Sequence, residues 1–115
     1  MNKFVEIARF TENLDEIIQF YQKVLAVEPA VRSEGMAIFM LGETKLFFHR
    51  SYTPGEGELP PENHLAFSVP DVDAACAQLT AAGLSIEVAG KEYYWGYSAY
   101  LRDPDGQLVE LIQAE

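Results

Sequence analysis

Hydrophobic and polar residues alternate along residues 3–10, which is the pattern of a half-buried β-strand. From Leu14 the apolar residues recur every three or four positions instead, and Asn13 before them is a candidate N-cap, so a helix is predicted there. The apolar stripe of this helix comprises Leu14, Ile17, Ile18, Tyr21, Val24 and Leu25. Three short β-prone segments follow, at 30–33, 36–41 and 45–50. Residues 1–50 therefore predict a β-α-β-β-β module.

The same order of elements returns after residues 51–63, a segment rich in Pro, Gly and Glu that is typical of a linker. Asp71 is the predicted N-cap of a second helix, and Gly83 is placed to end it. The strands predicted for this module, residues 64–115, lie at 64–69, 84–88, 97–102 and 107–113.

A constant spacing relates the two modules. Glu6 and His64 are 58 positions apart, and so are the two candidate caps and the first residues of the two helices. Aligning Leu46 with Leu108 places the last strands 62 positions apart, and the four extra residues are assigned to a long loop around 89–94. One spacing shared by a strand, a cap and a helical stripe indicates duplication of one unit.

Composition and charge restrict the class of protein. The 115 residues are 49% hydrophobic and form one predicted α+β domain. The net charge of −10 disfavours nucleic acid and anionic membranes as partners and favours cationic ligands. The single cysteine, Cys76, cannot form an internal disulfide, and the absence of a long apolar run predicts a soluble, cytoplasmic protein.

The last predicted strand carries an unusual carboxylate. Residues 103–106 (Asp-Pro-Asp-Gly) have the composition of a type I turn. In the strand that follows, Glu110 shares one face with Leu108 and Ile112. Glutamate is seldom buried among aliphatic residues unless it is paired or bound to a metal, so Glu110 is a candidate functional residue.

Taken together, these motifs resemble the vicinal oxygen chelate superfamily of glyoxalases, extradiol dioxygenases and bleomycin-resistance proteins. The resemblance covers nearly the whole chain and rests on Leu14-Asp15, Phe20-Tyr21, His64, Val72-Asp73, Ala82-Gly83, Trp95-Gly96 and the stretch from Asp103 to Glu110. It implies two tandem βαβββ modules that form curved mixed β-sheets around a cleft.

In that superfamily a metal ion is held by the first and last strands of each module. The resemblance carries those positions to Glu6, Phe48, His64 and Glu110, and strand alternation is expected to turn His49 to the opposite face. Phe48 cannot coordinate a cation, whereas one imidazole and two carboxylates suit Mn, Fe, Ni or Zn. The superfamily's dioxygenases and fosfomycin enzymes use two histidines and one glutamate, so Glu6 departs from that set.

The leading hypothesis is a metal-dependent lyase, isomerase or dioxygenase that acts on a small vicinal-oxygen substrate. Its metal ligands are Glu6, His64 and Glu110, of which Glu6 and Glu110 are also the candidate catalytic groups; the residues expected to shape the cleft are Phe48, Trp95, Tyr97 and Tyr100. From the residues alone, Glu6 also fits a solvent-facing strand position, and His64 also fits a backbone-bonded residue beside the linker.

The alternative hypothesis is a metal-free protein that resembles the bleomycin-resistance proteins and sequesters a cationic aromatic ligand. The acidic charge, the aromatic cluster and Phe48 at a ligand position favour it. Under either hypothesis the partner is a small molecule, and the resemblance implies a homodimer.

Overall fold

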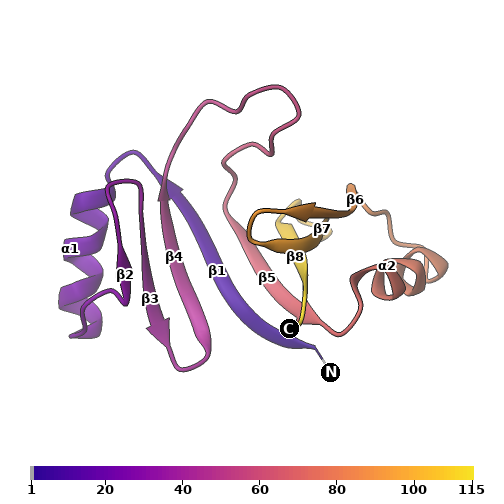
Figure 1. The fold of residues 1–115 in the computed structure, drawn as a ribbon, viewed down its shortest axis with the longest axis horizontal. Coiled ribbons are helices and arrows are strands. Elements are labelled where there is room, and N and C mark those ends of the chain that lie inside the picture. Colours follow the sequence, from indigo (N-terminus) through magenta and orange to yellow (C-terminus); the bar gives the residue numbers. More distant parts are fainter. Residues whose placement is uncertain (1) are drawn as a thin grey trace. The chain divides into compact units, whose positions relative to one another are not determined.

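The computed structural model describes residues 2–115, which form two compact units. The first unit comprises residues 6–63, and the second comprises residues 2–5 together with 64–115. Each unit contains one helix and a four-stranded ladder (Figure 1), as the predicted α+β fold of two βαβββ modules requires. No helix among the described residues is both long and apolar enough to cross a lipid bilayer.

The first unit has its strands in the order β2-β3-β4-β1. β1 and β4 run parallel, and the other neighbours are antiparallel. Its elements are β1 (Lys3–Thr11), of which residues 6–11 lie in this unit, α1 (Leu14–Leu25), β2 (Val31–Arg32), β3 (Met36–Leu41) and β4 (Thr44–Arg50). The apolar stripe of α1 packs on one face of this ladder, and the buried core there comprises Leu14, Ile18, Ala37, Phe39, Leu46 and Phe48.

The second unit repeats this arrangement, with the strand order β5-β8-β7-β6 and with β5 parallel to β8. Its elements are β5 (His64–Val69), α2 (Val72–Ala81), β6 (Val88–Tyr93), β7 (Gly96–Arg102) and β8 (Leu108–Gln113). The core under α2 comprises Val69, Val72, Ala99, Leu101 and Leu111. We call the face of each ladder that is turned away from its helix the open face.

The two helix starts differ from each other. Asp71 caps α2 as predicted, because its side chain accepts a hydrogen bond from the backbone N–H of Ala74 at 3.0 Å. Asn13 precedes α1, but its side chain makes no capping hydrogen bond within residues 2–115. Thr11 is the polar side chain engaged there, since its hydroxyl accepts the backbone N–H of Asn13 at 2.9 Å.

One predicted strand was wrong. Residues 84–88 alternate in hydrophobicity, yet the strand begins only at Val88 and runs through the residues that were predicted to be a loop. The reason is the two-residue turn formed by Tyr94 and Trp95, across which Tyr93 pairs with Gly96 and joins β6 to β7. Ile86 packs against the core under α2 instead.

Strand pairing shifts the predicted alignment of the last strands by one residue. Ala8 on β1 pairs with Phe47 on β4, and Ala66 on β5 pairs with Glu110 on β8. Because Ala8 and Ala66 are separated by the same 58 positions as the other matched pairs, the residue that corresponds to Glu110 is Phe47. The prediction that assigned this position to Phe48 was wrong.

Candidate active site

Glu110 is the centre of a buried polar cluster on the open face of the second unit. Its neighbours in sequence, Val109 and Leu111, pack on the helix side, so strand alternation turns Glu110 to the open face. Glu110 is only 3% exposed, yet both of its carboxylate oxygens have partners. A carboxylate this deeply buried requires such partners, because desolvation otherwise disfavours its charge.

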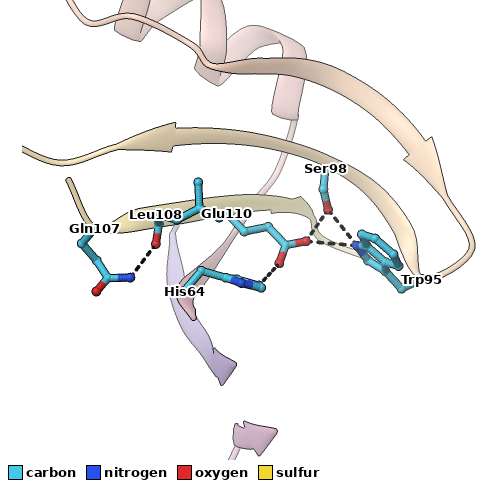
Figure 2. Close-up of polar contacts among 6 residues, drawn as sticks. All are labelled: His64, Trp95, Ser98, Gln107, Leu108 and Glu110. Atoms are coloured by element: carbon cyan, nitrogen blue, oxygen red, sulfur yellow. Dashed lines mark hydrogen bonds and ion pairs between the residues drawn. The ribbon is translucent and has the colours of Figure 1, made fainter. Parts of the chain in front are cut away.

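One oxygen of Glu110 is held by two donors from the adjacent hairpin. The Ser98 hydroxyl donates to Oε2 at 2.7 Å, and the indole N–H of Trp95 donates to the same oxygen at 3.0 Å (Figure 2). Ser98 is fully buried on β7, and Trp95 lies in the turn between β6 and β7. The hairpin therefore fixes the orientation of the carboxylate.

The other oxygen of Glu110 faces His64. Nε2 of His64 lies 3.1 Å from Oε1, and Figure 2 shows the imidazole and the carboxylate pointing toward one another. The parallel pairing of β5 with β8 brings the two side chains to the same face, since Ala66 pairs with Glu110 and His64 is two residues earlier. The ring of Tyr100 stands edge-on to the imidazole, with the ring centroids 5.9 Å apart.

The environment of Glu110 keeps it ionised. Burial alone would raise the pKa of this carboxyl group, but the hydrogen bonds from His64, Ser98 and Trp95 favour the charged form, as does the positive charge that His64 carries when protonated. Together these contacts hold the pKa of Glu110 below its ordinary value. At neutral pH the cluster therefore presents a negative charge beside an imidazole.

Three aromatic residues surround the polar cluster. Tyr93 stacks on Trp95 with the ring planes 3° apart and the centroids 4.5 Å apart. The ring of Tyr100 is edge-on to Tyr93. Burial, and next the negative charge of Glu110, raise the pKa of the Tyr93 hydroxyl, so Tyr93 remains neutral. Of the residues predicted to shape the site, Trp95 and Tyr100 thus lie beside Glu110 and His64.

Tyr97 does not contact this cluster, which corrects the prediction that placed it there. Its neighbours on β7, Ser98 and Tyr100, take the open face, whereas Tyr97 packs on the helix side against the core under α2. Its hydroxyl donates to the carboxylate of Asp73 on α2 at 2.8 Å. Gly90 permits this contact, because a Cβ atom there would lie 2.5 Å from Oδ1 of Asp73 and 2.7 Å from the Tyr97 ring.

Phe48 does not shape the site either. Its side chain is fully buried in the core under α1, where its ring centroid lies 4.9 Å from that of Tyr21 and 6.2 Å from that of Phe39. The neighbouring side chains of β4 therefore face the other way, so Phe47 and His49 take the open face of the first unit. His49 thus lies on the face opposite to Phe48, as strand alternation predicted, and that face is the open face of the first unit.

Glu6 belongs to the first unit, on β1. Its neighbour Ile7 packs against the core under α1, so Glu6 takes the open face, where it is half-buried. Register gives it the same place in the first unit that His64 has in the second, because Glu6 pairs with Lys45 on β4 and His64 pairs with Leu108 on β8.

Sequence reasoning missed Ser98 and did not single out the role of Tyr93. A signal for Ser98 was present: it is a small polar residue in a β-prone stretch, and it shares a face with Tyr100 two residues later. What could not be read from the sequence is that a two-residue turn brings Trp95 back toward the strand that carries Glu110.

The donor atoms of the second unit fit a divalent cation. Ligand bonds from imidazole and carboxylate are about 2.0–2.2 Å long, so two ligands at a right angle are about 3 Å apart. Nε2 of His64 and Oε1 of Glu110 are 3.1 Å apart, which is compatible with a shared cation as well as with a hydrogen bond. The other oxygen of Glu110 is already anchored, as carboxylate ligands in metal sites usually are.

Comparison with known proteins agrees with this arrangement. Residues 3–111 match the model of the Glyoxalase/Bleomycin resistance protein/Dioxygenase superfamily. The chain belongs to this superfamily. Metallothiol transferase FosB of Shouchella clausii is 34% identical over 104 residues, which cover 86% of this chain and 71% of that protein.

Two further relatives extend the comparison. A probable lactoylglutathione lyase of Vibrio cholerae is 27% identical over 114 residues, which cover 88% of this chain and 83% of that protein. A superfamily member of Vibrio splendidus, known from its crystal structure, has a TM-score of 0.74 at 16% identity and covers 99% of this chain and 100% of that one. At that identity the likeness establishes the glyoxalase-type fold alone.

Proposed function

We propose that this superfamily member is a metal-dependent enzyme, a lyase, isomerase or dioxygenase that acts on a small molecule with two neighbouring oxygen atoms. Its cation ligands are Glu6, His64 and Glu110. The observation that carries the proposal is the 3.1 Å approach of His64 to Glu110, a carboxylate that is buried, ionised and anchored by its other oxygen. The similarity to metallothiol transferase FosB supports it.

The residues of the site have different proposed roles. A bound divalent cation would supply a Lewis acid that stabilises negative charge developing on a substrate oxygen. Glu110 and His64 are held rigidly by the hairpin and by strand pairing, which suits them to binding. Glu6 is half-buried on a strand of the other unit and is assigned the role of proton acceptor. Tyr93, Trp95 and Tyr100 form an aromatic wall beside the polar cluster.

The experiment that tests the proposal is metal analysis by mass spectrometry on protein purified without a chelator or a histidine tag. Near-stoichiometric Mn, Fe, Ni or Zn is expected in the parent and is expected to be lost in His64→Ala. His49→Ala is the matched control, since His49 is the only other histidine and contacts the Arg50 carbonyl oxygen rather than a carboxylate. Absence of metal from the parent, even after soaking with each ion, would refute the proposal.

A second candidate function is favoured by the parallel stack of Tyr93 and Trp95 and by the net charge of −10. A metal-free superfamily member with these features would sequester a cationic aromatic compound, which is attracted both to aromatic faces and to negative charge. Trp95 is the only tryptophan, so its emission reports such binding directly. Quenching of that emission by the planar cation ethidium in chelator-treated protein would favour this function. Calorimetry, which does not need the tryptophan, should then show that Trp95→Leu no longer binds ethidium.

We also expect the protein to be a homodimer in the cytoplasm with a small-molecule ligand. Sedimentation velocity at micromolar concentration tests the first expectation, and a monomer there would remove it.

A further inference from the structure

The two oxygens of Glu110 have different surroundings. Oε2 accepts hydrogen bonds from both Ser98 and Trp95, and these two bonds occupy both lone pairs of that oxygen. Oε1 contacts only the imidazole of His64 among the described residues. The carboxylate therefore offers one oxygen, not two, to anything that binds beside His64.

Both donors are held in place by their own surroundings. Ser98 is fully buried within β7, and its main chain pairs with Ile112 of β8. The indole of Trp95 is held on one face by the stacked ring of Tyr93, and its N–H also lies 3.4 Å from the Ser98 hydroxyl oxygen. Releasing Oε2 would require the hairpin to move and would leave a buried carboxylate oxygen without a donor, at a substantial energetic cost.

We propose that Trp95 and Ser98 are specificity-determining residues that make Glu110 a one-oxygen donor and so select small transition-metal ions over Ca²⁺. The inference rests on the proposed function. Ca²⁺ takes about six to eight oxygen ligands, and a carboxylate that binds through both oxygens supplies two of them. Ni²⁺ and Zn²⁺ need fewer ligands and accept imidazole readily, so one carboxylate oxygen satisfies them.

The test is calorimetric titration with Ni²⁺ and with Ca²⁺ on the full chain. In Ser98→Ala and in Trp95→Phe, which retains a ring to stack on Tyr93, the Ni²⁺ affinity is expected to fall by about tenfold or more. The Ca²⁺ affinity is expected to rise or stay constant, because Oε2 becomes available, so the ratio of Ni²⁺ to Ca²⁺ affinity falls by at least as large a factor as the Ni²⁺ affinity. The double variant should show the largest change, and Ser98→Thr, which keeps the hydroxyl, should restore the parent ratio.

The matched control is Tyr94→Phe. Tyr94 lies in the same turn, is 93% exposed and stands edge-on to Trp95, but it donates no hydrogen bond to Glu110. Its variant should keep the parent ratio. If Ser98→Ala and Trp95→Phe lower both affinities by the same factor, their role is general support of the fold and the inference is overturned.

A measurement on metal-free protein separates this inference from the proposed function. Trp95 gives the single indole N–H signal in an NMR spectrum, and its hydrogen exchange should be slow in the parent and fast in Glu110→Ala. Rapid exchange in the parent overturns the inference even if the protein binds Ni²⁺. Slow exchange without any Ni²⁺ binding overturns the proposed function, and the selectivity with it.

Discussion

Phe47 and Glu110 hold equivalent positions in the two units. Phe47 pairs with Ala8 on β1, and Glu110 pairs with Ala66 on β5, the residue that corresponds to Ala8. Each lies on the open face of its own unit. The duplicated fold therefore places a carboxylate in one unit where the other has a phenyl ring. Phe48, one residue later, belongs to a different environment, the core under α1.

This difference predicts unequal costs for the two phenylalanines. Phe48→Ala should lower the free energy of unfolding by about 3–5 kcal/mol, because it leaves a cavity among fully buried residues. Phe47→Ala should cost less than half as much, since Phe47 is only partly buried. Urea unfolding followed by far-ultraviolet circular dichroism measures both values. Equal costs would place both rings in the same core and contradict the register.

The same register predicts a gain of function. If Glu6, His64 and Glu110 bind a cation, Phe47→Glu should add a fourth ligand and strengthen Ni²⁺ binding by about tenfold or more, because affinity rises with the number of charged ligands. Phe48→Glu should not do so, because it buries a charge in the core and unfolds the protein. Calorimetric titration measures the affinities, and an unchanged value for Phe47→Glu would contradict this prediction.

Hydrophobic periodicity was enough to predict the α+β fold and the repeated module, because the cores under α1 and α2 impose it on every element they touch. It could not resolve a register shift of one residue on β4, where Phe47 and Phe48 have the same hydrophobicity and opposite faces. It also misplaced β6, since the strand begins only at Val88 and, of the alternating apolar residues before it, Ile86 packs against the core whereas Leu84 is exposed.

The two helix starts predict a difference in capping energy. Asp71→Ala should lower the free energy of unfolding by about 1 kcal/mol, because it removes the hydrogen bond to the Ala74 N–H. Asn13→Ala is the matched control and should change it by less than half that amount, since the Asn13 side chain does not cap α1. Urea unfolding of both variants gives the comparison, and a larger loss for Asn13→Ala would contradict the structure.

Gly90 lies where the pairing of β6 with β7 is irregular, between Val88 and Lys91. Gly90→Ala should lower the free energy of unfolding by about 1 kcal/mol or more, because its Cβ would displace Tyr97 from Asp73. Gly35→Ala should be near neutral, since no described atom lies within 4 Å of the added methyl group. Thermal unfolding of both variants checks this, and equal melting temperatures would argue against the close approach.

Glu110 predicts a specific acid sensitivity. Its pKa in the folded state lies below the ordinary value of about 4.3, so the stability that its ionised form contributes is present above that pH. That contribution is lost as the pH falls through the lower, folded-state pKa. The difference in free energy of unfolding between the parent and Glu110→Gln should therefore be constant near neutrality and shrink below about pH 4.3. A difference that stays constant to pH 3 would contradict the assignment.

The sequence singled out Glu110 and His64, which the structure places 3.1 Å apart, because a carboxylate among aliphatic residues and a matched repeat position are both visible in one chain. The residues that donate hydrogen bonds to Glu110 could not be predicted in the same way. Ser98 and the indole of Trp95 reach Glu110 through strand pairing and a tight turn, and neither distance follows from spacing along the chain.

The parallel pairing of β5 with β8 has a consequence for the order of folding. β6, β7 and β8 are neighbours in sequence and form local antiparallel pairs, whereas His64 must meet a partner 46 residues away. Closing the longer loop costs more chain entropy and is the slower event. We therefore expect the Glu110 carboxylate to be anchored by its hairpin before the imidazole of His64 arrives, so that the pair is incomplete in a chain still folding until β5 docks.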